Sequence, residues 1–250
     1  MFKRLSAAAI AATAGAAVQA ADLSICVEGA YPPFSFIAAD GSIQGFDIDI
    51  ANALCAQMDM TCELVQIEWV AIIPALLERR CDAIVASMSN TTERRNLIDF
   101  STKYYNTPAR YVGPEGMTLE DLGPDTTVGV QRDSVHQTFT RDRFPRVPIR
   151  PFDSADAMFQ ALAGGEIAAV MADSVAIQDA FLGTPAGDGF QHFGPDYAEP
   201  DYHGLGAAVA VRQGEEALRN AFSHAIGTLR ASGTYQEINA RYFDFDIYGG

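Results

Sequence analysis

Residues 62–89 read CELVQIEWVAIIPALLERRCDAIVASMS, and this stretch decides the fold. We expect a strand over residues 62–67 and a helix over residues 70–80, with Ile73, Leu76 and Leu77 on its inward face. Residues 82–87 form an apolar run of the kind that a parallel sheet buries on both faces. A strand, a helix and a second strand in this order predict a parallel sheet flanked by helices.

The same alternation of strands and helices extends to both sides of this stretch. The further strands are expected over residues 23–28, 126–131, 167–172 and 209–211. The further helices are expected over residues 46–58, from Ser134 onward, and over residues 154–163 and 215–232. We interpret residues 104–123 as a crossing segment and residues 182–200 as a surface stretch rich in Gly, Pro and Asp. The order predicts two α/β lobes, between which the chain crosses more than once.

Composition excludes several broad classes of protein. The chain has 250 residues, of which 48% are hydrophobic, so it has enough apolar surface to fold and is not intrinsically disordered. It carries 17 Lys and Arg against 32 Asp and Glu, which gives a formal net charge of −15. A charge of this sign argues against nucleic acid and against anionic membranes as partners.

The first twenty residues have the pattern of a secretory signal peptide. Lys3 and Arg4 precede a small, apolar run from Ala7 to Val18, and the small residues after it fit cleavage following Ala20. The run is too short to span a bilayer, which takes about 20 residues, and no later stretch reaches that length. The signal predicts an exported protein, which in a Gram-negative bacterium is periplasmic. Because no Cys stands at the cleavage point, we expect no lipid anchor.

Four cysteines bear on the exported state, because an oxidising compartment permits disulfides. Cys55 and Cys62 lie at the end of a predicted helix and the start of the next strand, and we predict that they form a disulfide. Cys26 and Cys81 belong to or adjoin buried strands, and we expect two buried thiols, with a second disulfide as the alternative. Neither the cysteines nor the scattered histidines have the spacing of a metal site.

Candidate binding residues follow the predicted strands, because ligands in such sheets bind beyond the carboxyl ends of the strands. Arg94 can hold a carboxylate through two hydrogen bonds, and the helix start at Ser134 and Val135 adds backbone donors. Asp173 can receive an ammonium group, and Glu28 can receive a second positive group. Tyr31 and Trp69 offer flat surfaces for an aliphatic or guanidinium side chain. Together these residues suit a zwitterionic ligand.

Several motifs carry a resemblance to one family. They are EGAYPPF at 28–34, GFDIDI at 45–50, DAIVASMS at 82–89 with Arg94 beyond it, VGVQ at 128–131 and RYFDFDIY at 241–248. In these motifs the sequence resembles the family 3 solute-binding proteins, the periplasmic receptors of polar amino-acid ABC transporters. It is most similar to the lysine/arginine/ornithine and histidine binders. The resemblance covers essentially the whole chain after residue 20.

The resemblance implies a type II, Venus-flytrap fold with two hinge crossings. Residues 21–108 and 205–250 would form lobe 1, residues 109–204 would form lobe 2, and residues 1–20 would be the signal peptide. We expect the hinge near residues 105–112 and the second crossing near residues 202–206.

The resemblance also implies a role for each binding residue. Arg94, Ser89 and the backbone of Val135 would hold the α-carboxylate, Asp173 and Ser87 the α-ammonium group, and Glu28 the distal cation of a basic amino acid. Tyr31 and Trp69 would sandwich the ligand's side chain. Four residues depart from the pattern: Ala86 stands where the basic-amino-acid binders usually have a serine, Asp133 replaces a usual glycine, Val135 replaces a frequent threonine, and Glu28 is one methylene longer than the aspartate of several relatives.

The function predicted on these grounds is binding, without catalysis and without a cofactor. The ligand would be a basic amino acid of the arginine, ornithine, lysine and histidine class, and the partner an inner-membrane ABC permease. A guanidino opine such as octopine and glutamine are alternative ligands, and a cyclohexadienyl dehydratase on the same fold is an alternative activity. We expect a monomer.

Overall fold

Two five-stranded sheets organise the chain, of which the computed structural model describes residues 21–249. The first sheet has the strand order β5 (Cys62–Gln66), β1 (Leu23–Val27), β6 (Ala83–Ile84), β13 (Ala207–Arg212) and β7 (Ile98–Tyr105). The second has the order β10 (Ile149–Phe152), β9 (Val128–Gln131), β11 (Ala169–Asp173), β8 (Ala109–Pro114) and β12 (Phe190–Tyr197). We call the elements around the first sheet lobe 1 and those around the second sheet lobe 2. The predicted signal peptide lies outside the described residues.

Both sheets follow the same plan. In lobe 1, β1 pairs in parallel with β5 and β6, and in lobe 2, β9 pairs in parallel with β10 and β11. The strand that follows each chain crossing, β13 or β8, joins the sheet antiparallel to β6 or β11. The predicted α/β class with flanking helices is therefore confirmed, and each sheet is mixed because the chain enters it once from the other lobe.

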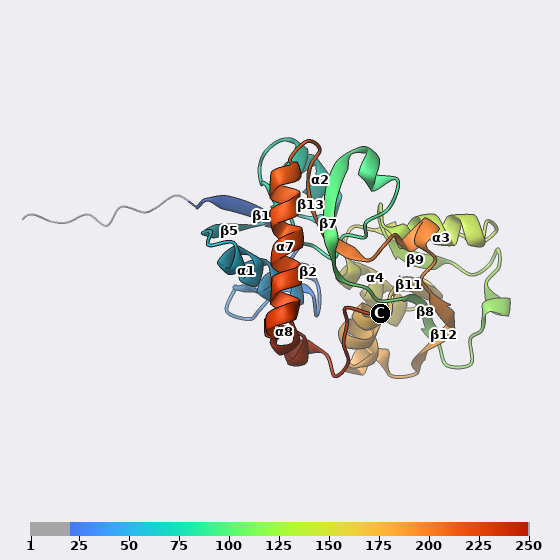
Figure 1. The fold of residues 1–250 in the computed structure, drawn as a ribbon. Helices are drawn as coiled ribbons and strands as arrows, with labels where there is room; N and C mark the ends of the chain where they lie inside the picture. The colour runs from blue at the N-terminus through green and yellow to red at the C-terminus, as the bar shows by residue number, and fades with distance from the viewer. Residues whose placement is uncertain (1–20, 250) are drawn as a thin grey trace, which may run out of the picture.

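Side chains of the lobe 1 strands point alternately into two apolar layers. Helix α7 (Glu216–Ser232) lies across one face of this sheet (Figure 1). Ile25 and Val27 pack toward the helices α1 (Phe46–Gln57), α7 and α8 (Thr234–Tyr242). Cys26 and Ile84 face the opposite side, where α2 (Trp69–Leu77) covers the sheet. Because a strand's side chains point alternately to its two faces, a strand buried on both faces reads as a continuous apolar run.

Lobe 2 is layered in the same way. Helix α3 (Val135–Arg143) places Phe139 against Val128 and Val130 of β9, and α4 (Ala155–Ala163) and α5 (Ser174–Ile177) lie in the layer with Val170 of β11. Each fully buried side chain of this size stabilises the fold by about 1.5–3 kcal/mol. The remaining α-helix is α6 (Pro200–His203), and a small sheet comprises β2 (Ala30–Tyr31), β3 (Ser35–Ile37) and β4 (Ile43–Gln44).

The chain crossings are shorter than the sequence indicated. Residues 104–123 do not form one crossing segment, because β7 ends at Tyr105 and β8 already begins at Ala109. Only residues 106–108 connect the lobes there, and residues 204–206 connect α6 to β13. Pro108 precedes strand β8 and Pro114 ends it, and the residues between them pair with β11 and β12.

Residues 182–200 also contain more structure than expected. Strand β12 runs through this stretch and pairs antiparallel with β8 at the edge of the second sheet. Its register shifts between Phe193 and Tyr197, where Gly194 and Pro195 interrupt regular pairing. An edge strand tolerates proline and glycine at such an irregularity, which explains why the composition concealed the strand.

Two disulfides lie in lobe 1. Cys55 and Cys62 are bonded, as predicted. The expectation of free thiols at Cys26 and Cys81 is wrong, because these two residues form a second disulfide. Strand β6 lies beside β1, which brings the two Cα atoms to 5.7 Å, within the usual range for a disulfide.

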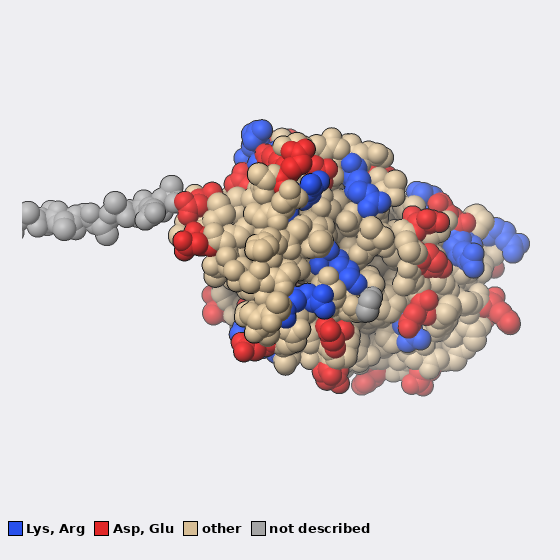
Figure 2. Space-filling model, viewed as in Figure 1, with Lys and Arg blue, Asp and Glu red and all other residues tan. Residues whose placement is uncertain are grey.

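Figure 2 shows the charged side chains on one face of the molecule. Acidic side chains lie on both halves of this face, with basic side chains among them. None of the helices described is long and apolar enough to cross a membrane.

Candidate ligand-binding site

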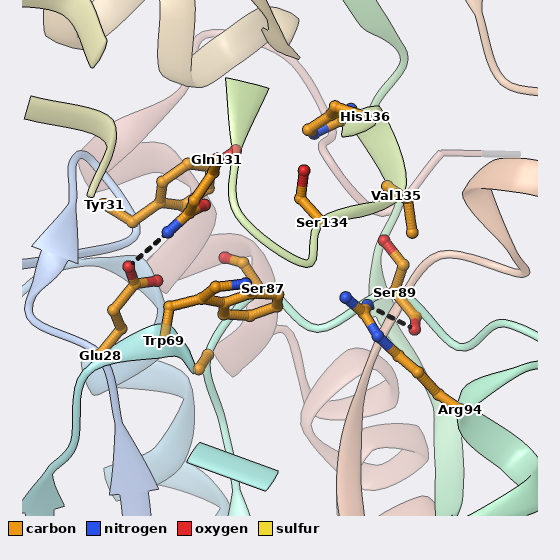
Figure 3. Close-up of a pocket in the computed structure, with 11 residues that line it drawn as sticks. Glu28, Tyr31, Trp69, Ser87, Ser89, Arg94, Gln131, Ser134, Val135 and His136 are labelled. Carbon is orange, nitrogen blue, oxygen red and sulfur yellow. Dashed lines mark hydrogen bonds between the residues drawn. The ribbon is translucent and has the colours of Figure 1, made fainter. Parts of the chain in front are cut away.

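The structure brings nearly all predicted binding residues together around one cavity between the lobes (Figure 3). Lobe 1 contributes the residues that follow β1 and β6, and lobe 2 contributes those that follow β9. The carboxyl ends of parallel strands therefore line the cavity from both sides, as expected for α/β sheets. The lining residues are Glu28, Tyr31, Trp69, Ala86, Ser87, Ser89, Arg94, Gln131, Ser134, Val135 and His136. Asp173, the remaining predicted residue, lines an adjoining cavity with Tyr31, Ser87, Ser89, Val135 and His136.

Glu28 forms one end of the cavity. Its carboxyl group is buried, and its Oε1 atom accepts a hydrogen bond of 2.8 Å from Nε2 of Gln131 in lobe 2. Burial raises the pKa of Glu28 to about 8, although the hydrogen bond from Gln131 acts in the opposite direction. No basic side chain pairs with Glu28 among residues 21–249. A cation placed beside this carboxyl group would therefore restore its ionised form.

Arg94 lies at the opposite end, on the short 3₁₀ helix Arg94–Asn96. Its guanidinium donates to the backbone oxygens of Ser89 at 3.1 Å and of Asp133 at 3.3 Å. No carboxylate of the described chain lies within ion-pair distance, and burial lowers the pKa of Arg94 to about 10. A guanidinium that borders a cavity and has no acidic partner can bind an anion such as a carboxylate through two hydrogen bonds.

The start of helix α3 lies beside this guanidinium. Ser134 is the N-cap residue, and its hydroxyl accepts a hydrogen bond from the N–H of Gln137 at 3.3 Å. Val135 occupies the first helical position, where the N–H has no acceptor within the helix. The helix start thus adds backbone donors at the Arg94 end of the cavity, as the sequence predicted.

Asp173 has a structural role and also faces the adjoining cavity. It caps helix α5, with its Oδ1 accepting from the N–H groups of Val175 and Ala176, and Thr107 donates to its Oδ2. Burial raises the pKa of Asp173 to about 6, and these hydrogen bonds partly offset the shift. A carboxylate has about four acceptor positions, so Asp173 can hold the helix start and still accept from a ligand's ammonium group.

Ser87 is held by a buried network behind the cavity. Its hydroxyl donates to Asp47 at 2.8 Å, and its N–H donates to the hydroxyl of Tyr104, which in turn donates to Asp47. Ser87 has a φ angle of 52°, a conformation that residues other than glycine rarely adopt. Burial raises the pKa of Asp47 to about 7. Asp47 therefore supports the geometry of Ser87 and does not line either cavity.

The two aromatic residues differ in how they are fixed. Tyr31 is buried and stacks on Phe34 with ring centres 5.7 Å apart. Trp69 begins helix α2, its Nε1 donates to the backbone oxygen of Arg132 at 2.9 Å, and the Arg94 guanidinium lies 5.1 Å from its ring centre. Trp69 lies between Glu28 and Arg94 in Figure 3, where its ring forms a wall of the cavity.

Two lining residues were not assigned a role from the sequence. Gln131 is the last residue of β9, so the rule that identified Glu28 at the end of β1 also applied to it. His136 follows Val135 on α3, and burial lowers its pKa to about 3, which keeps the imidazole neutral. His136 lies 6.0 Å from His203, measured between ring centres, and both rings border the cavity that Asp173 lines.

One cavity between two α/β lobes thus has the carboxyl group of Glu28 at one end and the guanidinium of Arg94 at the other. The chain belongs to the bacterial extracellular solute-binding proteins, family 3, whose family model matches residues 23–245.

Curated relatives agree with this assignment. The chain is 42% identical to an L-arginine-binding protein of Pseudomonas aeruginosa over 232 residues, covering 90% of this chain and 89% of the relative. It is 34% identical to the lysine/arginine/ornithine-binding periplasmic protein of Escherichia coli over 224 residues, covering 88% of this chain and 86% of the relative. Both relatives are named as binding proteins, in agreement with the family of solute-binding proteins to which this chain belongs.

A solved structure has the same fold. A periplasmic binding protein of Salmonella typhimurium, described for its high arginine specificity, superposes with a TM-score of 0.82. The two sequences are 29% identical, and the match covers 88% of this chain and 98% of the other. The two-lobed fold predicted from the sequence is therefore confirmed.

Proposed function

We propose that this protein is the periplasmic receptor for L-arginine of an ABC importer. One observation carries the proposal: Arg94 and Glu28 stand at opposite ends of one cavity, and neither has a charge partner among the described residues. A ligand with a carboxylate at one end and a cation at the other satisfies both ends. The names of the relatives, which include arginine and lysine/arginine/ornithine binders, support the same ligand class.

In the proposed complex the α-carboxylate binds Arg94 and the N–H of Val135. The α-ammonium group binds Asp173, and the hydroxyl and backbone of Ser87 border it. The aliphatic part of the ligand passes Trp69 and Tyr31, and the guanidinium ends at Glu28. Ala86 and Ser89 lie on the lobe 1 side of this path.

The ligand would also control the position of the lobes. Residues 21–108 and 205–250 move as lobe 1 and residues 109–204 as lobe 2, with the crossings at 106–108 and 204–206 as hinges. Arg94 belongs to lobe 1 and Asp173 to lobe 2, so an α-amino acid contacts both and its binding energy favours the closed form. The permease would recognise the closed form.

Location and maturation belong to the same proposal. The signal peptide is removed after Ala20, and the mature chain remains in the periplasm without a lipid anchor. The intact mass of the exported protein tests this, since a chain that begins at Ala21 is expected. A mass that retains any of residues 1–20 would place the cleavage elsewhere.

Isothermal titration tests which ligand the protein binds. The purified protein is first unfolded and refolded to remove any bound ligand. We expect the tightest binding for arginine among arginine, ornithine, lysine, histidine, glutamine and octopine. Glu28→Gln should weaken arginine binding by roughly 2–5 kcal/mol, because a buried cation loses its charged partner. The matched control is Glu63→Gln, at an exposed position of β5, and it should leave affinity unchanged. Preference for glutamine or for octopine over arginine would contradict the proposal.

A further inference from the structure

Three consecutive residues of lobe 2 reach across the cavity to lobe 1. Nε2 of Gln131 donates to Glu28 at 2.8 Å, while the backbone oxygens of Arg132 and Asp133 accept from Trp69 at 2.9 Å and from Arg94 at 3.3 Å. We call residues 131–133 the clasp segment. Each of its residues contacts a different lobe 1 side chain of the cavity, so these contacts exist only when the lobes are closed.

The clasp segment is fixed to lobe 2. The N–H of Arg132 donates to the backbone oxygen of Phe152 at 2.7 Å, and its side chain forms an ion pair with Asp153 at 2.6 Å. Asp133 has a φ angle of 55°, and its N–H donates to the side chain of Gln137 at 2.8 Å. Aspartate is one of the few residue types that adopts this conformation with local hydrogen bonding. The segment therefore moves with lobe 2 and presents Gln131 to Glu28 at a defined position.

Gln131 and Glu28 leave two acceptors free at the end of the cavity. The hydrogen bond between them uses Nε2 of Gln131 and Oε1 of Glu28, so the amide oxygen of Gln131 and Oε2 of Glu28 remain. Neither of these oxygens accepts a hydrogen bond from the chain over residues 21–249. In Figure 3 both residues lie at the same end of the cavity, joined by the hydrogen bond.

The number and arrangement of these acceptors favour one cation over another. A guanidinium is planar and directs five N–H groups in fixed directions, so it can donate to two neighbouring acceptors at once. An ammonium group carries three rotatable N–H donors on one nitrogen at the end of a flexible stem, so it has no fixed pair of donors to match these two acceptors. The amide oxygen adds a hydrogen bond for the guanidinium without adding a second negative charge.

We propose that Gln131 is a specificity-determining residue, which together with Glu28 forms a two-acceptor site that prefers a guanidinium to an ammonium group. The two-acceptor site is complete only when the clasp segment contacts lobe 1. The distal end of the ligand's side chain is therefore recognised as the lobes close. This inference rests on the proposed function, because it concerns the side chain of the same ligand.

Titration of Gln131→Leu with arginine and lysine tests the inference. Leucine has a similar volume but no acceptor, so arginine affinity should fall roughly tenfold to a hundredfold, as expected for a lost hydrogen bond to a charged group. Lysine affinity should fall by much less, and the preference for arginine over lysine should drop about tenfold. Stopped-flow measurements should place the loss in the dissociation rate, because the contact forms after encounter.

Two further variants control the experiment. Gln191→Leu, at an exposed position of β12, should leave both affinities unchanged. Gln131→Asn keeps the amide but is one methylene shorter, so it should lose the contact with Glu28 and reduce the preference as well. Circular dichroism shows whether Gln131→Leu folds. If it does not, Gln131→Asn replaces it as the test variant.

The failures of the two proposals are distinguishable. If the unmodified protein binds neither arginine nor lysine, the proposed function is wrong. If it binds arginine, but Gln131→Leu and Gln131→Asn keep the original ratio of the two affinities within about threefold, the proposed function survives and the role of Gln131 is overturned.

Discussion

Glu28 makes a prediction that depends on pH and on the charge of the ligand. Burial in the closed cavity raises its pKa from 4.5 to about 8 when no cation is beside it. In an open, solvated cavity its pKa should return toward 4.5. At a pH between 4.5 and about 8, closure around an uncharged ligand therefore protonates Glu28. This closure becomes more favourable as the pH falls. Closure around a cation keeps Glu28 ionised and takes up no proton there.

Arginine and citrulline isolate this effect, because citrulline replaces the guanidinium with an uncharged group of the same shape. Each unit of pKa difference corresponds to about 1.4 kcal/mol. Between pH 8 and pH 5 the affinity for citrulline should therefore rise by about two to three orders of magnitude relative to that for arginine. Asp173 and His136 also have shifted pKa values, but they face the part of the ligand that the two compounds share. Their contributions cancel in the ratio.

Isothermal titration at pH 5, 6, 7 and 8, in buffers of different ionisation enthalpy, measures both affinity and proton uptake. We expect about one proton taken up with citrulline at pH 6–7 beyond any taken up with arginine. In Glu28→Gln the ratio of the two affinities should no longer depend on pH. A ratio in the unmodified protein that stays constant within about threefold from pH 8 to pH 5 would refute the reasoning.

Three other changes have defined outcomes. Arg94→Ala should weaken arginine binding by about 2–5 kcal/mol in a titration, because the α-carboxylate loses a buried partner; near-normal affinity would remove Arg94 from the site. Replacing Cys26 and Cys81 with alanine should lower the free energy of unfolding by about 4 kcal/mol in denaturant titrations, from the chain-entropy cost of a loop with a separation of 55 residues. Equal stability of this variant and the oxidised protein would contradict that estimate. Gly204→Ala should lower the melting temperature, because φ is +73° and a Cβ atom would lie 2.4 Å from the backbone oxygen of Asn90; an unchanged melting temperature would exclude this clash.

Many residues of the cavity could be predicted because they directly follow apolar strands, which can be recognised in the sequence itself. Glu28, Ser89 and Asp173 each follow an apolar run, and the carboxyl ends of parallel strands meet at one edge of a sheet. Arg94 required the resemblance to a family, since Arg95 next to it is equally basic and the sequence alone does not distinguish the two. The roles of individual residues stay predictions until a ligand is measured.

Other features depend on which strands become neighbours in the fold. That information is not contained in any short stretch of the sequence. The disulfide between Cys26 and Cys81 requires β6 beside β1, and the contact of Gln131 with Glu28 requires two lobes to meet across 103 positions of sequence. Strand β8 was overlooked because its flanking prolines indicate a loop, whereas its pairing on both sides fixes it as a strand.

The charged groups around the cavity predict a coupling between ligand recognition and closure of the lobes. Burial raises the pKa of Glu28 and Asp173 and lowers that of Arg94, so all three groups are shifted toward their uncharged forms. For Glu28 alone, closure at pH 7 without a cation has a free-energy cost on the order of 3 kcal/mol. In the proposed complex, a basic amino acid would place an opposite charge beside each of the three groups and remove this penalty. The hydrogen bonds of the clasp segment would then hold the lobes together, so we expect closure to be favoured when the ligand's charges match those at both ends of the cavity.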